Sequence, residues 1–320
     1  MTPILTVNDL RVDFYQNGLI SNSALRGVSF SLEPGKTLGV VGETGCGKTL
    51  TGMAIMGLLP PSAKRLGTIS LEGTGLLTPE TMGTVRGSQI SVIFQNPHSA
   101  FNPVFTIGSQ LRLVALKRGI ARSEVEDVLT ERLRSVGLRD TARVICSYPH
   151  QLSGGMLQRC MIAMALISRP KLLIADEPTT ALDSTIGKQV LELIKGLQER
   201  EGFAMLFISH DVTVVSEVAD DVAVLYAGKI VEYGPSAQVM NSPNHPYSQG
   251  LLGAIPSAAK PRGKLTAIKG SVPANTSEIV GCAFTPRCPQ AFEQCSQEPQ
   301  LLSVASSETL QSVACWRVQS

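Results

Sequence analysis

The segment Gly42–Thr49, with the sequence GETGCGKT, constrains this chain more than any other part of it. It follows an apolar run at residues 38–41 and precedes a run at residues 50–56 that can form a helix. Glycines let the backbone curl around an anion, and the start of the following helix adds a positive dipole end. Lys48 would offer a charge to the outer phosphates, and Thr49 a hydroxyl to Mg²⁺. A chance glycine-rich turn is the alternative, and the flanking strand and helix argue against it. The segment therefore predicts a nucleoside triphosphate site made of Gly42, Glu43, Thr44, Gly45, Cys46, Gly47, Lys48 and Thr49.

The composition limits the class of partner. Lys and Arg number 28 and Asp and Glu 26, so no large basic surface is expected, which argues against nucleic acid as a partner. The first residues lack the pattern of a signal peptide, and no apolar run reaches the length of about 18 residues that a membrane span needs. We therefore expect a cytoplasmic protein, in which the seven cysteines would not form structural disulfides.

Polar side chains follow three apolar, strand-like runs. Gln95 follows residues 90–94, Asp176 and Glu177 follow residues 172–175, and His210 follows residues 205–208. Ligands of open α/β sheets bind at the carboxyl ends of the strands. Asp176 is then a candidate for holding Mg²⁺ through water, and Glu177 for polarising an attacking water. Gln95 and His210 are weaker candidates, because taken alone each is an ordinary residue at a strand end.

A second glycine-containing segment, Leu152–Gly155, precedes an apolar helix at residues 161–167. Ser153 is a good helix N-cap. A plain capped helix does not need Gly154 and Gly155 in its first turn. The pair would leave the start of the helix bare, as if the phosphate of another molecule approaches it.

The remaining patterns predict an α/β fold with several parts. Residues 5–30 alternate like antiparallel strands, and residues 222–226 and 229–233 like a hairpin. Residues from about 97 to 165 form a helical subdomain, in which apolar residues recur at helical spacing. Proline recurs beyond Gly234, which predicts a small, loop-rich C-terminal extension. We place one domain at residues 1–240 and the extension at residues 241–320.

These elements together resemble an ATP-binding-cassette (ABC) ATPase. The phosphate-binding segment, Gln95, Leu152–Gly155, Asp176-Glu177, Asp183 and His210 occur in the order of that family. The resemblance covers the whole chain and is closest to the ATPase subunits of bacterial dipeptide and oligopeptide importers, in the peptide/nickel group. The supporting stretches are residues 94–97 (FQNP), 148–156 (YPHQLSGGM), 245–252 (HPYSQGLL) and 281–289 (GCAFTPRCP). Met156 departs from the general cassette pattern, where many members have Gln, but this group often has Met there.

The resemblance implies a P-loop NTPase fold with a RecA-like core, and an ATPase that powers peptide import across the bacterial cytoplasmic membrane. A nickel or metallophore cargo, or another small solute, is the alternative. Two cassettes would face head to tail, with ATP between the phosphate loop of one and Ser153, Gly154 and Gly155 of the other. The implied partners are a second homologous ATPase, two transmembrane permease subunits and an extracytoplasmic solute-binding protein. The chain would be peripheral, on the cytoplasmic face of the inner membrane.

The resemblance also implies roles for single residues. Thr49, Gln95 and Asp176 would hold Mg²⁺, while Glu177 orients or deprotonates water and His210 contacts the γ-phosphate. Asp183 would belong to the nucleotide site. An aromatic residue upstream would stack on adenine, and we favour Phe14 over Tyr15.

Four late cysteines run C-x5-C-x6-C-x19-C: Cys282, Cys288, Cys295 and Cys315. A short, proline-rich segment with a small core benefits from a metal that ties it together. Four thiolates suit zinc or a [4Fe–4S] cluster. Some importers of the resembled type carry an iron–sulfur cluster on a similar set, which favours the cluster, with zinc and free thiols as alternatives.

Three further points stay open here. A soluble cassette acting on DNA or ribosomes is an alternative class, but the long coiled-coil insertion or second cassette of such proteins is not seen. A metal-sensing or scaffold role for the cysteine segment is another. Cys46 lies at a helix start, where the pKa of a thiol tends to fall; alternatively, it is only a small residue that the loop tolerates.

Overall fold

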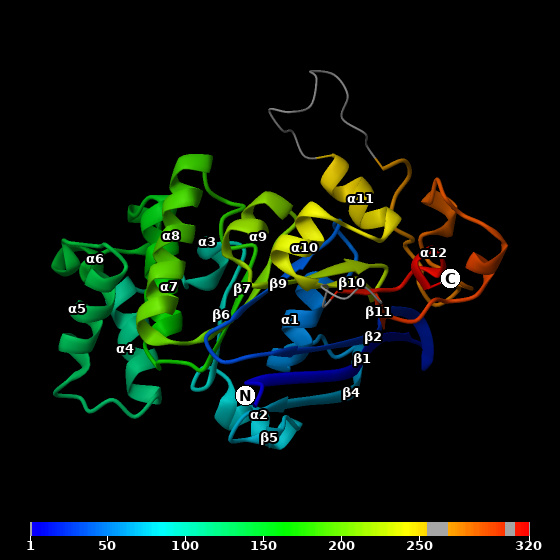
Figure 1. Ribbon diagram of the computed structural model, residues 1–320. Coiled ribbons are helices and arrows are strands. Elements are labelled where there is room, and N and C mark those ends of the chain that lie inside the picture. Colours follow the sequence, from blue (N-terminus) through cyan, green and yellow to red (C-terminus); the bar gives the residue numbers. More distant parts are fainter. Residues whose placement is uncertain (1, 255–267, 305–310, 320) are drawn as a thin grey trace. The chain divides into compact units, whose positions relative to one another are not determined.

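The computed structural model describes residues 2–254, 268–304 and 311–319 (Figure 1). These residues belong to two compact units. Unit 1 comprises residues up to 32, residues 36–78 and residues from 207 onward. Unit 2 comprises residues 33–35 and 79–206. Strand β8 (Ala204–Ile208) runs across the boundary from unit 2 into unit 1. None of the helices in the described ranges is long and apolar enough to cross a membrane.

The first sheet of unit 1 is the antiparallel sheet that the sequence predicts. Its order is β2-β1-β4-β5. The strands are β1 (Leu5–Gln16), β2 (Leu19–Leu32), β4 (Ala63–Leu71) and β5 (Gly75–Leu76). β1 and β2 form a hairpin whose turn is Asn17-Gly18, both with positive φ, as a tight two-residue turn requires.

The second sheet of unit 1 combines a strand from the N-terminal part of the chain with strands of the C-terminal extension. Its strands in this unit lie in the order β11-β12-β10-β9-β3. Their bounds are β3 (Thr37–Val41), β9 (Asp221–Tyr226), β10 (Lys229–Pro235), β11 (Leu302–Ser303) and β12 (Ser312–Val313). β3 is wholly buried and parallel to β9, while β9 and β10 form the predicted hairpin. β12 pairs with β10, so the extension continues this sheet.

Short helices complete unit 1. They are α1 (Lys48–Met56), α9 (Val212–Val218), α10 (Ser236–Asn241), α11 (Pro246–Gly253) and α12 (Trp316–Gln319), with 3₁₀ turns η2 (Thr285–Arg287) and η3 (Glu293–Ser296). Helix α9 packs closely on β3 at Gly39. A Cβ at this position would lie 2.3 Å from Val215 Cγ1, so the packing requires glycine.

Unit 2 contains a pair of parallel strands and the helical region. Strands β6 (Ile90–Ile93) and β7 (Leu172–Asp176) pair with Ile90 opposite Leu172. The helices are α2 (Pro79–Val85), α3 (Pro97–Ala100), α4 (Ile107–Lys117), α5 (Val125–Ser135), α6 (Thr141–Cys146), η1 (Pro149–Gln151), α7 (Gly154–Leu166) and α8 (Ser184–Glu201). Val125, Leu129 and Leu133 of α5 are buried, as their helical spacing predicts.

The compact units join segments that are distant in the sequence, and the domain boundary at residue 240 stays a prediction. The boundary that we placed after residue 240 falls inside unit 1, in which residues from 207 onward group with the N-terminal strands. The pairing of β10 with β12 explains this grouping, because it adds the extension to the sheet that begins with β3.

Candidate nucleotide-binding site

The phosphate loop lies between β3 and α1 in unit 1, as predicted, and its glycines are required for two different reasons. Gly42 has a φ of 155°, and a Cβ there would lie 2.3 Å from the carbonyl oxygen of Leu225. Gly45 faces open space, but its φ of 85° is one that other residues rarely adopt. Glycine is therefore required at position 42 by close packing and at position 45 by the backbone conformation.

Lys48, at the start of α1, is held inside the loop. Its side chain is buried, and Nζ donates to the carbonyl oxygens of Gly42 at 2.8 Å and Glu43 at 3.0 Å. Thr44, Gly45 and Thr49 are exposed. The loop thus presents an exposed rim around a fixed cation, which is the arrangement that phosphate binding needs.

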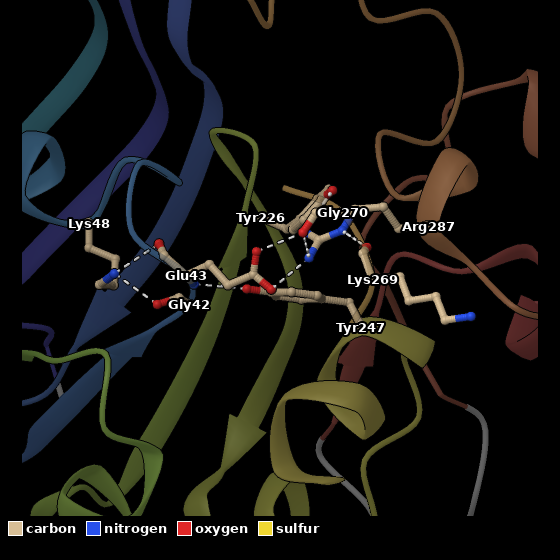
Figure 2. Close-up of polar contacts among 8 residues, drawn as sticks. All are labelled: Gly42, Glu43, Lys48, Tyr226, Tyr247, Lys269, Gly270 and Arg287. Atoms are coloured by element: carbon tan, nitrogen blue, oxygen red, sulfur yellow. Dashed lines mark hydrogen bonds and ion pairs between the residues drawn. The ribbon is translucent and has the colours of Figure 1, made fainter. Parts of the chain in front are cut away.

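Two residues of the C-terminal extension (residues 241–320, called the C-terminal segment below) contact the loop, and sequence reasoning missed both. The hydroxyl of Tyr247 accepts from the Glu43 N–H at 2.9 Å, and Arg287 forms an ion pair with the Glu43 carboxylate at 2.8 Å (Figure 2). No local pattern could have identified them, because they lie 204 and 244 residues away from Glu43 in the chain.

The pKa expected for Cys46 is wrong in direction. The helix start and Lys48 do act to lower it, but the side chain is fully buried in the loop. Desolvation is the largest effect and raises the pKa above that of a free thiol. Cys46 is therefore a small buried residue of the loop, as the alternative interpretation had it.

The two other sequence candidates in unit 1 lie on β1 and after β8. Phe14 and Tyr15, near the end of β1, are both half-buried. The ammonium of Lys64 lies 4.7 Å from the ring centroid of Tyr15, so one face of that ring is covered. His210 is exposed and directly precedes Asp211, the N-cap of α9.

In unit 2 the structure brings Gln95 and Glu177 together. Gln95 Nε2 donates to Oε2 of Glu177 at 3.0 Å, and the Thr180 hydroxyl donates to the same oxygen at 2.9 Å. Glu177 has a φ of 47°, an uncommon conformation for a residue with a Cβ, which marks a sharp turn after β7. Asp176 is the half-buried last residue of β7. An amide donor and a hydroxyl thus orient one carboxylate at the end of a buried strand.

The glycine pair at the start of α7 has two separate explanations. Ser153 caps the helix as predicted, accepting from the Met156 N–H at 3.3 Å. A Cβ on Gly155 would lie 2.9 Å from Cγ2 of Ile186, whereas the nearest atom to one on Gly154 would be 3.8 Å away. Packing against α8 thus requires glycine at position 155, whereas position 154 has room for a Cβ; the contact of both glycines with a second nucleotide stays a prediction. Asp183 is exposed and caps α8, accepting from the Ile186 N–H at 3.0 Å.

The late cysteines line one small cavity of about 20 Å³ in unit 1. All four are free, and Cys282, Cys288 and Cys315 are half-buried while Cys295 is buried. Burial, and to a lesser degree the neighbouring thiols, raises the pKa of Cys288 and of Cys315. Within the described ranges, however, no group of three or more His, Cys, Asp or Glu residues is arranged to hold a metal ion.

Comparison with known proteins identifies the class of this fold and site. A family described as "ABC transporter" matches residues 25–180, and "Oligopeptide/dipeptide transporter, C-terminal region" matches residues 231–295. A dimeric ATP-binding cassette solved in a post-hydrolysis state with ADP and Pi has a TM-score of 0.62 and 25% identity, covering 72% of this chain and 98% of that one.

Curated relatives extend the similarity over nearly the whole chain. The dipeptide transport ATP-binding protein DppD of Bacillus subtilis is 43% identical, covering 99% of this chain and 95% of the relative. The oligopeptide transport ATP-binding protein OppD of Salmonella typhimurium is 42% identical, covering 93% and 90%. The chain therefore belongs to the ABC transporter ATP-binding proteins that carry the oligopeptide/dipeptide transporter C-terminal region. It is an ATP-hydrolysing subunit of this family.

Proposed function

We propose that this chain powers the import of peptides across the bacterial cytoplasmic membrane. The observation that carries the proposal is the phosphate loop with its buried Lys48, in a chain 43% identical to a dipeptide transport ATP-binding protein. The C-terminal match at residues 231–295 supports a peptide transporter rather than a soluble cassette.

The proposed mechanism gives each site residue a role. Lys48 and the loop amides bind the phosphates, His210 contacts the γ-phosphate, and Phe14 stacks on the base. Thr49, Gln95 and Asp176 hold Mg²⁺, and Glu177 orients the attacking water. Bound Mg²⁺ would neutralise charge on the phosphates. The hydrogen bonds of Gln95 and Thr180 to Glu177 support its role, because they fix the carboxylate that must face the water.

We further propose that the chain works as one half of a cassette pair. Ser153, Gly154 and Gly155 would approach the nucleotide of a second, homologous ATPase, with Asp183 nearby in each site. The room beside Gly154, where a Cβ would meet no atom closer than Leu182 Cδ2 at 3.8 Å, supports this, and the related cassette bound to ADP and Pi is dimeric.

Membrane subunits would dock on unit 2. Large apolar side chains are exposed there, from the end of β6 to η1: Phe94, Val104, Phe105, Leu113, Leu116 and Tyr148. Exposed large apolar side chains that gather into one patch mark an interaction surface, and these six are the candidates for such a patch in unit 2. We therefore propose two permease subunits as partners, an extracytoplasmic solute-binding protein beyond them, and a peripheral position on the inner membrane.

We propose that Cys282, Cys288, Cys295 and Cys315 hold a metal, as a [4Fe–4S] cluster or, alternatively, as zinc. The proposal is supported by the chemistry of the donors, because four free thiols line one cavity, although the described residues are not arranged as a metal site in this structure. The cavity has room for about one water molecule, so binding requires the thiols to turn and the loops to spread around a cluster. Anaerobic purification with metal analysis tests this proposal. Iron with sulfide supports the cluster, and stoichiometric zinc supports the alternative. Protein that contains neither metal would refute both assignments. Replacing Cys295 by Ser should abolish binding, while Cys146→Ser, on an exposed cysteine outside the set, should not.

Transport is tested in proteoliposomes that contain the chain with its co-purified permease subunits and solute-binding protein. ATP supplied on the side of the membrane where this chain lies should drive uptake of labelled dipeptides or longer peptides. Lys48→Ala in this chain should stop the uptake. Uptake of a nickel complex without peptide uptake would assign a different cargo to the same machine. A soluble cassette would instead be indicated by a chain that hydrolyses ATP but binds no membrane subunit, either in cell extracts or after co-expression.

A further inference from the structure

The second residue of the phosphate loop, Glu43, is held by the C-terminal segment at both its main chain and its side chain. The Tyr247 hydroxyl accepts from its N–H at 2.9 Å. Arg287 holds its carboxylate with two hydrogen bonds, from Nη1 to Oε2 at 2.8 Å and from Nη2 to Oε1 at 3.0 Å (Figure 2). This two-pronged contact is the strongest and most directional kind of ion pair that a carboxylate forms.

Arg287 is itself fixed by several neighbours. Its Nε donates to the Lys269 carbonyl oxygen at 2.9 Å, Nη2 to that of Gly270 at 3.2 Å, and Nη1 to the Tyr226 hydroxyl at 3.4 Å. The rings of Tyr226 and Phe284 lie 5.8 and 6.0 Å from the guanidinium carbon. The side chain is only 7% exposed. The guanidinium is therefore a rigid anchor for Glu43 rather than a mobile surface charge.

A second cation lies on the opposite side of Glu43. Lys48 Nζ donates to the main-chain oxygen of Glu43 at 3.0 Å, while the carboxylate of the same residue points toward Arg287 (Figure 2). The phosphate-binding ammonium is thus already in contact with the residue whose carboxylate Arg287 holds. A released carboxylate would turn to this ammonium, because an anion next to a buried cation gains Coulomb energy.

We propose that Arg287 is a positioning residue for nucleotide binding. It holds the Glu43 carboxylate away from Lys48, so that the ammonium stays available to the phosphates of the nucleotide. The C-terminal segment thereby acts on the nucleotide site of its own chain. This inference rests on the phosphate loop as the nucleotide site, which the wild-type protein tests in the same experiment.

The test is the equilibrium dissociation constant (Kd) of MgADP for the full-length chain, measured by calorimetry. Arg287→Gln should weaken binding about fivefold, since the released Glu43 carboxylate, which is 26% exposed, would compete for Lys48 with about the strength of a partly solvated ion pair. Adding Glu43→Gln to this variant should restore binding to within about twofold of wild type, because the competing carboxylate is then gone. The defect of the single variant should also shrink at high salt, where the competing charges are screened.

Glu298→Gln is the matched control. Glu298 also links the C-terminal segment to the rest of unit 1, by ion pairs with Arg26 at 2.5 Å and Lys229 at 2.6 Å, but these partners lie outside the phosphate loop. This control should bind MgADP like wild type. Should Arg287→Gln not fold, Arg287→Lys gives the same comparison: weaker binding that Glu43→Gln relieves.

Two results would overturn the proposal. One is unchanged MgADP binding in folded Arg287→Gln. The other is a loss of binding that the added Glu43→Gln does not relieve, which would show that Arg287 acts by supporting the fold and not by holding the carboxylate. Wild-type protein that fails to bind MgADP would instead refute the nucleotide site itself.

Discussion

Gln95 and Glu177 are joined by a hydrogen bond of 3.0 Å between Nε2 and Oε2, although 82 residues separate them in the chain. One follows β6 and the other follows β7, and these strands are parallel neighbours in unit 2. Because parallel strands end at the same edge of a sheet, the two side chains are placed together by the sheet and not by a local motif. This contact links the proposed Mg²⁺-binding amide to the proposed catalytic carboxylate.

Replacing Glu177 by Gln should nearly stop ATP hydrolysis and spare ATP binding. A catalytic base contributes typically ~10²–10⁴-fold to the rate, and the amide keeps the size of the side chain while losing its basicity. The measurement is single-turnover hydrolysis together with the Kd of MgATP. Wild-type turnover by the variant would refute the assignment.

Replacing Gln95 by Ala should lower kcat by about tenfold, because a hydrogen bond to a charged group is lost. Thr180→Val is the matched comparison, since the Thr180 hydroxyl binds the same Glu177 oxygen at 2.9 Å. Steady-state kinetics of the two variants and of their combination would show whether the contacts act together. If neither variant changes kcat, orientation of the carboxylate does not limit hydrolysis.

The two glycines at the start of α7 should respond differently to Ala. Gly155→Ala places a Cβ 2.9 Å from Ile186 Cγ2 and should lower the free energy of unfolding by about 1–3 kcal/mol. Gly154→Ala has room and should leave that free energy within about 0.5 kcal/mol, while it lowers ATP hydrolysis by the assembled transporter. Urea denaturation and ATPase assays separate these effects. Equal stability of the two variants would contradict the packing explanation.

Cys46 should resist alkylation in the native protein, with or without MgATP. Its side chain is fully buried and burial raises its pKa, so thiolate is scarce at neutral pH and the reagent has no access. Cys146 is exposed and serves as the internal reference. Mass spectrometry after iodoacetamide treatment gives the ratio of labelling at the two cysteines, and urea-unfolded protein should lose the difference. Comparable labelling in the native state would show that the loop opens.

The elements that could be predicted are those whose signals are local. The phosphate loop needs glycine at fixed positions, and the hairpin of β9 and β10 turns at Ala227-Gly228, where both φ angles are positive. β7 reads as buried because its residues 172–175 are all apolar. In each case the requirement lies within a few residues, so the sequence shows it directly.

Contacts between distant segments could not be predicted in this way. Gly155 looks like a feature of a helix start until Ile186, 31 positions further along the chain, is placed against it. The burial of Cys46 depends on the strands around the loop, and it outweighs the local effect of the helix start on the pKa. Arg287 belongs to a cysteine-containing stretch that suggests metal binding, and nothing in that stretch indicates a partner in the phosphate loop.

The union of the C-terminal segment with the sheet of unit 1 has a practical consequence. A recombinant fragment that stops at residue 240 would lack the strand that covers the edge of β10, and the tyrosine and arginine that hold Glu43. Such a fragment would keep the sequence motifs of an ATPase. We nevertheless expect it to bind nucleotide more weakly than the full chain. Grafting the C-terminal segment onto another cassette, or removing it for crystallisation, is therefore expected to change the nucleotide-binding site as well.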